Sequence, residues 1–333
     1  MIFVYQLTRG VLALMIGFIC SIFAGLVLVP LLKKIKVNQS LSVYLSKTHK
    51  EKEGTPTMGG LIFIIPTIVS IVVLLILKKI DFSSNLFIVM FVFLSYALLG
   101  FIDDFLIIKR HNNEGLTVIQ KLIGQIAIAV VFYIIYMKSG AKPIIEFYTL
   151  GFNIHLGWFY AVFILFMLVA SSNAVNITDG LDGLAGGLSL IVFLTFALIS
   201  GNARGIEGTS DISVFCFVLV GCLLGFLAFN SRPAKVFMGD TGSLALGASL
   251  ASIAIITKHE LTFIVVMGVF IFETLTCIIQ TISMVYFHKK VYLMTPYHHH
   301  LEKLGWNERD IVIALWCVGL FLSFAAILFG VWY

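Results

Sequence analysis

Residues 11–32 read VLALMIGFICSIFAGLVLVPLL, twenty-two residues without a charge. A helix of about 20 apolar residues is long enough to cross the hydrocarbon core of a bilayer. An apolar stretch near the N-terminus can also be a signal peptide, but this one is longer than the usual signal-peptide core and many apolar runs follow it. It is therefore expected to remain in the protein as a membrane anchor.

The rest of the chain has the same character. Of its 333 residues, 60% are hydrophobic and 12% are charged, against about 45–50% and about 25% in a soluble domain. Runs this long exclude barrel strands and indicate helices, which satisfy their own backbone hydrogen bonds in lipid. The sequence predicts an all-α integral membrane protein, a single polytopic domain over residues 1–333 with about ten transmembrane helices near 11–32, 58–77, 86–102, 118–137, 158–172, 184–200, 212–229, 242–257, 261–286 and 311–332.

The basic residues predict the orientation of these helices. Alternate connections carry fourteen Lys and Arg, whereas the other set, with the N-terminus, carries seven. The richer set should be cytoplasmic, which puts both termini outside. The cytoplasmic loops are then about 33–57, 103–117, 173–183, 230–241 and 287–310.

The cysteines and the net charge exclude other classes. All five cysteines lie in apolar runs and none forms a CxxC pair, so they are expected to be packing residues rather than disulfides or metal ligands. The net charge of +5 is explained by topology, and nothing indicates nucleic-acid binding.

The unusual polar residues gather in the cytoplasmic loops. The motifs are HKEKEGTPTMGG (49–60), GFIDDF (100–105), NAVNITDGLDG (173–183), NSRPAKVFMGDTGS (230–243) and TPYHHHLE (295–302). The outward loops hold only scattered charges. This asymmetry predicts one site, on the cytoplasmic face, assembled from five loops.

Three of these motifs contribute aspartates. Asp103 and Asp104 are expected to end the third span, where the helix dipole and their mutual repulsion call for a cation or a raised pKa. Asn176, Asp179 and Asp182 recur every three residues, a spacing that would bring them toward one helical face; a capped turn is the simpler reading. Asp240 lies between two glycines before the next span, where it could bind a divalent ion beside an anion-binding helix N-terminus.

The remaining motif residues allow two readings each. Three adjacent histidines, His298 to His300, cannot share one face, so one or two are expected to point inward for phosphate binding or proton transfer, although an interfacial cluster would look the same. Lys52 and Thr57 with a Gly-rich turn suit phosphate without forming a P-loop. Glu273 lies within a predicted span, and its role stays open between function and a helix–helix contact.

The combination favours phosphoryl transfer. Hard oxygen ligands prefer Mg²⁺ or Mn²⁺ over zinc, and carboxylates with Lys and His are the groups that phosphoryl transfer uses. At a membrane interface the acceptor could itself be a lipid.

These five motifs, in this order, resemble those of the polyprenyl-phosphate N-acetylhexosamine-1-phosphate transferases over about residues 49–310. The intact HHH with GTPTMGG favours the branch that uses a muramoyl donor. The resemblance implies that undecaprenyl phosphate attacks UDP-MurNAc-pentapeptide in the bacterial inner (cytoplasmic) membrane, giving lipid I and UMP in the first membrane step of peptidoglycan synthesis, with Mg²⁺ as cofactor. Direct attack and a covalent intermediate both remain open, as does the oligomeric state, for which a homodimer is one option.

The resemblance also implies roles for residues. Asp103 and Asp104 match the catalytic pair, with Asp103 as base toward the lipid phosphate, Asp240 matches the metal ligand, and Lys121 is placed to meet the lipid phosphate. Phe237 would stack on the uracil. The other residues that match the catalytic and substrate-binding lining are Lys52, Thr57, Asn176, Asp179, Asp182, Asn230, Gly239, His298, His299 and His300.

Two alternatives remain from the sequence alone. A sister enzyme could transfer GlcNAc-1-phosphate from UDP-GlcNAc to the same lipid. A cation-coupled transporter is the rival from another class, but its path should carry ionisable groups through the membrane depth, whereas Glu273 is the one clear mid-span exception here.

Overall fold

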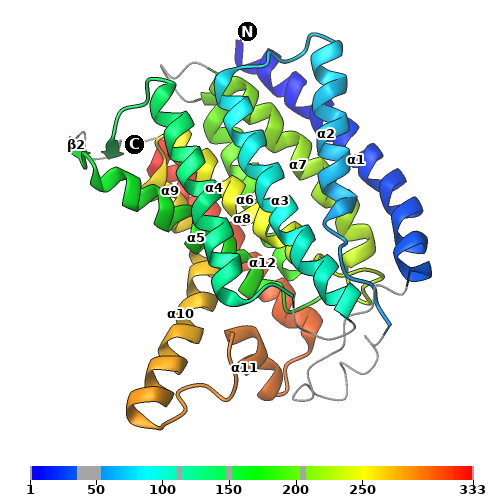
Figure 1. The fold of residues 1–333 in the computed structure, drawn as a ribbon. Coiled ribbons are helices and arrows are strands. Elements are labelled where there is room, and N and C mark those ends of the chain that lie inside the picture. The colour runs from blue at the N-terminus through cyan, green and yellow to red at the C-terminus, as the bar shows by residue number, and fades with distance from the viewer. Residues whose placement is uncertain (1, 36–53, 111–114, 148–151, 203–207, 332–333) are drawn as a thin grey trace.

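The computed structural model describes residues 2–35, 54–110, 115–147, 152–202 and 208–331, and in these ranges it is a bundle of helices with one short β-hairpin (Figure 1). The first four helices are α1 (Ile2–Lys34), α2 (Leu61–Ile76), α3 (Ser84–Arg110) and α4 (Val118–Lys138). The hairpin pairs β1 (Ile144–Phe147) with β2 (Phe152–His155). The remaining elements are α5 (Phe159–Thr178), α6 (Leu184–Asn202), α7 (Thr209–Asn230), α8 (Gly239–Ile256), α9 (Glu260–Val266), α10 (Gly268–Ile282), the π-helical turn η2 (Ser283–Phe287), α11 (Tyr297–Lys303) and α12 (Glu308–Val331).

The predicted all-α membrane fold is confirmed. In the described part of the chain, nine helical segments are long and apolar enough to cross a bilayer. The tenth predicted span is α2, whose 16 residues make a rod of about 24 Å. The hairpin was not predicted; it lies in the connection between α4 and α5.

The centre of the bundle is formed by α7 and α8. α1 and α6 both pack along α7, whereas α3 and α5 both pack along α8. Small residues allow this close packing: a Cβ on Gly247 would lie 2.4 Å from the backbone oxygen of Ser171. Glycine at such positions lets two helices bring their backbones together without a side chain between them.

Several predicted boundaries were wrong at the polar loops. α3 continues to Arg110 instead of ending before Asp103, α5 continues to Thr178, and α8 already begins at Gly239. Polar residues inside the bundle do not end a helix when neighbouring helices satisfy their side chains. The loop expected over 287–310 also contains a short helix, α11.

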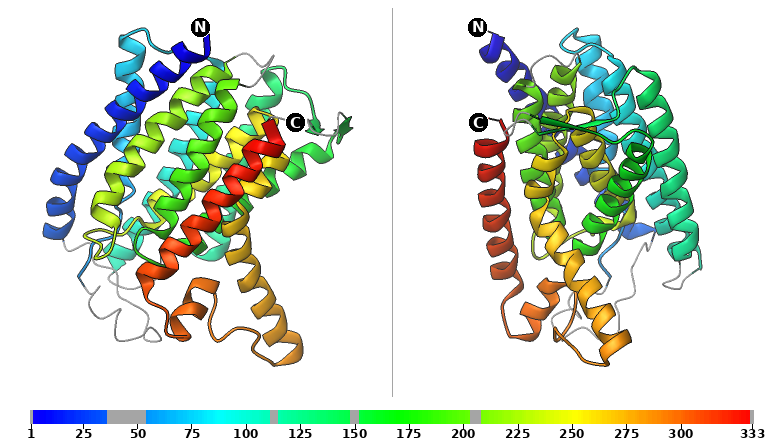
Figure 2. Two further views of the ribbon diagram at one scale, coloured as in Figure 1. Left: turned by 180° about the vertical axis from the view of Figure 1, so that it is seen from behind. Right: turned by 90° about the vertical axis from the view of Figure 1, so that its left-hand side faces the viewer.

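The predicted span 261–286 is also wrong as one helix. It is divided into α9 and α10 at Met267, whose ψ of 6° departs from helical geometry. After this break the first turns of α10 pack against the bundle, and the rest of the helix extends away from the other helices (Figures 1 and 2).

The two ends of the bundle differ in content. Figures 1 and 2 place the start of α1, the end of α12 and the β-hairpin at one end, with α11 and the ends of α3 and α5 at the other. The polar motifs that the structure describes thus share one end, opposite the two termini.

Candidate active site

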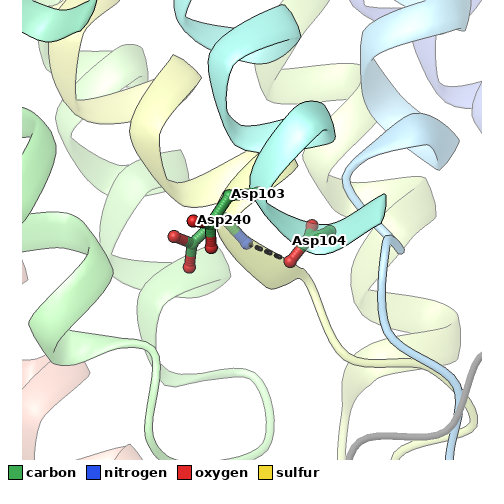
Figure 3. Close-up of side chains that lie close together, drawn as sticks. All are labelled: Asp103, Asp104 and Asp240. Atoms are coloured by element: carbon green, nitrogen blue, oxygen red, sulfur yellow. Dashed lines mark hydrogen bonds between the residues drawn. The ribbon is translucent and has the colours of Figure 1, made fainter. Parts of the chain in front are cut away.

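Three aspartates from two helices meet at the polar end of the bundle. Asp103 and Asp104 lie on α3 and Asp240 in the first turn of α8, and one carboxylate oxygen from each lies within 4.8 Å of the others. Figure 3 shows the carboxylates of Asp103 and Asp240 side by side, whereas that of Asp104 turns toward the backbone at the start of α8. The structure thus brings together three aspartates that the sequence places in two separate motifs.

Lys121 lies between Asp103 and Asp240. Its ammonium nitrogen forms an ion pair with Asp240 Oδ2 and lies 3.4 Å from Asp103 Oδ2. Two neighbouring carboxylates repel each other, so a cation between them stabilises the ionised forms of both.

The start of α4 positions this lysine. Thr117 and Gln120 form a reciprocal capping box that begins the helix at Val118, so Lys121 lies in its first turn. Just before the cap, the backbone N–H of Leu116 donates to Asp103 Oδ1 at 2.8 Å. Asp103 therefore binds the segment that carries Lys121 in two places.

Asp104 has a different set of partners from its neighbour. Its carboxylate accepts hydrogen bonds from the backbone N–H of Asp240 (3.2 Å), the backbone N–H of Thr241 (3.0 Å) and the Thr241 hydroxyl (2.6 Å). Free N–H groups at a helix N-terminus attract an anion. The GDTGS motif predicted an anion site at the start of α8, and the anion at these N–H groups is the side chain of Asp104.

Asn176 joins the cluster from α5. Its amide nitrogen donates to Asp240 Oδ1 at 2.6 Å and to the Ser243 hydroxyl at 2.9 Å. Asp240 is thereby held on both oxygens, by Asn176 on one and Lys121 on the other.

The GTPTMGG motif is attached to the VFMGDTGS motif through the backbone. Phe237 N–H donates to the Pro56 carbonyl at 2.8 Å, and Gly59 N–H donates to the Phe237 carbonyl at 2.7 Å. Gly239, at φ +73°, requires a conformation that glycine adopts readily. A Cβ there would lie 2.5 Å from Asp104 Oδ2 and 2.7 Å from the Thr57 hydroxyl oxygen, which places Thr57 beside the aspartates.

Asn230 and Asp182 organise the loops next to this cluster. Asn230 is buried, accepts from Gly183 N–H at 3.0 Å and donates to the Val236 carbonyl at 2.9 Å. Asp182 Oδ2 accepts from Ala234 N–H at 3.1 Å. Both side chains therefore connect the 179–183 turn to the loop that follows α7.

The predicted common helical face for Asn176, Asp179 and Asp182 was wrong. α5 ends at Thr178, Asp179 is its C-cap, and Asp182 lies beyond the following turn. A spacing of three residues brings side chains together only while the helix continues.

The three histidines diverge on α11, as their adjacency predicted. His298 is fully buried, and its Nδ1 lies 3.2 Å from Glu273 Oε2. His299 Nδ1 lies 2.6 Å from Glu302 Oε2, and His300 Nδ1 accepts from the backbone N–H of Leu293 at 3.1 Å.

One predicted site residue cannot be placed, and several residues at the site were not predicted. Lys52 lies outside the described residues. Sequence reasoning missed Thr241 and Ser243, although both stand in GDTGS, and it missed the ion pair between Arg232 and Glu308, whose Oε1 also accepts from Asp182 N–H at 2.9 Å. Glu308 begins α12, and no local pattern connects it with a turn 126 residues away.

Bundle and cluster together define the class of protein: a multi-pass helical membrane protein with a carboxylate centre at one end. The sequence profile of Glycosyl transferase family 4 matches residues 86–258, just over half of the chain. Residues 52–64 match phospho-N-acetylmuramoyl-pentapeptide-transferase signature 1.

Curated relatives define the family more narrowly. The chain is 44% identical over 322 residues to the phospho-N-acetylmuramoyl-pentapeptide-transferase of Geobacillus sp. (strain WCH70), covering 97% of this chain and 98% of the relative. It is 44% identical over 319 residues to the enzyme of that name from Bacillus subtilis (strain 168), covering 96% and 97%. The chain belongs to the phospho-N-acetylmuramoyl-pentapeptide-transferase family and is a phosphosugar transferase, as the motifs predicted.

Proposed function

We propose that this protein transfers phospho-MurNAc-pentapeptide from UDP-MurNAc-pentapeptide to undecaprenyl phosphate, forming lipid I and UMP. The observation that carries the proposal is the cluster of Asp103, Lys121 and Asp240 at the polar end of a membrane bundle, in a chain related over nearly its full length to enzymes of that name. The acceptor is a lipid, so a site at the end of the bundle can receive its phosphate from the bilayer.

Asp103 and Lys121 are proposed to act on the acceptor. The Lys121 ammonium would attract the lipid phosphate, and Asp103 would take its proton or hold it for attack on the β-phosphate of the donor. Positioning and charge compensation supply most of the rate acceleration in phosphoryl transfer. Asp103 Oδ1 accepts from Leu116 N–H, and its other oxygen, Oδ2, faces the Lys121 ammonium.

Mg²⁺ is the proposed cofactor, with Asp240 as its principal ligand and Asp103 and Asp104 beside it. The three carboxylates fit such an ion, because they offer hard oxygen ligands within 4.8 Å of one another and Mg²⁺ prefers oxygen. The ion would neutralise charge on the donor diphosphate. Full activity in excess EDTA would contradict this role.

The neighbouring loops are proposed to bind the donor. Phe237 would stack on the uracil, and the polar side chains around it would hold the ribose and diphosphate. This set comprises Lys52, Thr57, Asn176, Asp179, Asp182, Asn230, Gly239, His298, His299 and His300. The proposal is supported by the hydrogen bonds that connect Asp182 and Asn230 to the loops beside α8. It is also supported by the position of the Thr57 hydroxyl next to Gly239 and Asp104.

The membrane is proposed to be the bacterial cytoplasmic membrane, with the aspartate end facing the cytoplasm. The excess of Lys and Arg in the loops at that end supports this orientation. The nucleotide-linked donor would then enter the site from the cytoplasm, and the polyprenyl phosphate would enter it from the bilayer.

Purified protein incubated with undecaprenyl phosphate and one UDP-sugar at a time tests the proposal. We expect UMP release and a lipid-linked product from UDP-MurNAc-pentapeptide, and neither from UDP-GlcNAc. Product from UDP-GlcNAc alone would overturn it. The names of the relatives do not favour that alternative.

A further inference from the structure

Glu273 is a carboxylate inside the membrane bundle. It lies on α10 and its exposed fraction is 0%. A carboxylate in such a place is costly unless it is hydrogen-bonded, and an ionisable residue within a membrane span usually serves a specific purpose. The reaction as proposed above gives Glu273 no role.

The partner of Glu273 is His298, also with an exposed fraction of 0%. A single oxygen, Oε2, lies 3.2 Å from His298 Nδ1 and accepts the backbone N–H of His298 at 3.3 Å. An ionised carboxylate can only accept hydrogen bonds, so with Glu273 ionised the donor of this contact is Nδ1. The contact with the backbone N–H fixes the position of the His298 main chain relative to Glu273, and the contact with Nδ1 fixes the orientation of the imidazole ring.

The other ring nitrogen, Nε2, faces the motif that carries Asp179 and Asp182. It lies against Gly180, where an added Cβ would overlap it. Nε2 is buried, and it makes no hydrogen bond to any residue in the described ranges. Since Nδ1 is engaged by Glu273, Nε2 is the nitrogen left to interact with a substrate at this turn.

We propose that Glu273 is a positioning residue for the transfer reaction. It holds the His298 imidazole with Nδ1 engaged by the carboxylate and Nε2 directed at the 179–183 turn, where Nε2 can form a hydrogen bond with a polar group of the donor substrate. Carboxylates that orient a histidine in this way fix its tautomer and its ring orientation. The inference rests on the proposed function, because it assigns His298 to the donor.

Glu273→Gln is the first test, because it keeps the shape and removes the charge. We expect kcat/KM for UDP-MurNAc-pentapeptide to fall about 10–100-fold, the usual effect of losing such a partner. Glu273→Asp keeps the charge and should recover part of the loss. The matched control is Thr274→Val on the same helix, whose hydroxyl donates to the Phe270 carbonyl of its own helix; it should leave kcat/KM unchanged.

The state of the ring distinguishes positioning from a merely structural contact. In protein labelled with ¹⁵N-histidine, the His298 signals, assigned by their loss in His298→Asn, should show a protonated Nδ1 in the wild type. They should show a mixture of tautomers in Glu273→Gln. In the His298→Asn background, Glu273→Gln should lower activity no further.

Three results would overturn the inference: wild-type turnover in Glu273→Gln, an equal loss in both backgrounds, or an unchanged ring spectrum. If Glu273→Gln does not fold, the same comparisons are made with Glu273→Asp. Failure of the wild type to form lipid I would instead overturn the proposed function, so the two failures can be told apart.

Discussion

Asp103 and Asp104 are neighbours in sequence but have different partners. Successive residues on an α-helix point about 100° apart, so only Asp103 turns to Lys121, while Asp104 turns to the start of α8. Asp104 accepts three hydrogen bonds there, as an N-cap would, but from a different helix. We therefore expect substitutions of the two aspartates to have different effects on stability.

Asp104→Asn should destabilise the protein. The asparagine amide would present its own N–H groups to N–H donors of α8, leaving buried donors unpaired at a cost of about 1–3 kcal/mol. The melting temperature of the purified protein, measured without metal, should fall clearly below that of the wild type. Asp103→Asn keeps an oxygen that can accept from Leu116 N–H, so its melting temperature should decrease less. An equal or larger decrease for Asp103→Asn would contradict these different roles.

Residue types at the site were predictable, and their partners were not. Isolated carboxylates in an apolar chain already marked Asp103, Asp104 and Asp240. The acceptor–donor pairs depend on contacts over long separations, such as Asp104 with Thr241 across 137 positions. No local pattern specifies such a pair, because the helices between them must pack first.

At the scale of elements, the polar helix ends were the hardest to predict. Asn176 was assigned to a loop, yet it lies in the last turn of α5, where Asp240 and Ser243 satisfy its amide. The apolar middle of each helix was predicted well because length and hydropathy suffice there. The break between α9 and α10 depends on packing, since Gly268 lies where a Cβ would be 2.7 Å from Leu322.

The segment between α8 and α10 carries a second buried group of charges, at the end of the bundle with the termini. Lys258 Nζ donates to the Tyr160 hydroxyl at 2.8 Å, and that hydroxyl donates to Glu260 Oε1 at 3.3 Å. Burial raises the pKa of Glu260 from 4.5 to about 7, although Lys258 acts in the opposite direction. Burial also lowers the pKa of His259.

This pKa predicts a pH effect on stability. The unfolded chain ionises at Glu260 near pH 4.5 while the folded protein keeps the proton until about pH 7. The contribution of Glu260 is therefore complete below pH 4.5 and is lost as the pH rises through 7, by up to about 1.4 kcal/mol per pH unit. His259 acts in the opposite sense, so the wild type alone does not isolate the effect.

Comparison with Glu260→Gln isolates it, because glutamine can still accept from Tyr160 but does not titrate. The melting temperature of the variant relative to the wild type should increase steadily from pH 5 to pH 7.5. A difference that is independent of pH would show that Glu260 does not titrate in this range.

At the scale of the whole molecule, the arrangement follows from one asymmetry. The polar motifs occupy the end with α11, and the termini and the β-hairpin occupy the other (Figure 1). The sequence predicted this separation from the distribution of Lys and Arg. It did not predict how α10 leaves the bundle. An apolar helix face has the same composition whether it packs against protein or faces lipid, so the sequence does not distinguish the two.

Labelling from outside the cell tests the orientation. In a cysteine-free background, His155→Cys in β2 should react with a membrane-impermeant maleimide in intact spheroplasts. Lys303→Cys at the end of α11 should react only after permeabilisation. Both positions are exposed, so the reverse pattern would place the aspartates outside.

The central claim is that the aspartates at the polar end carry out phosphosugar transfer to a lipid. The most direct measurement is mass-spectrometric detection of lipid I after purified wild type and Asp103→Asn are each incubated with undecaprenyl phosphate, UDP-MurNAc-pentapeptide and Mg²⁺. The account predicts lipid I from the wild type and none from a folded Asp103→Asn. Lipid I at the wild-type rate from Asp103→Asn would contradict it.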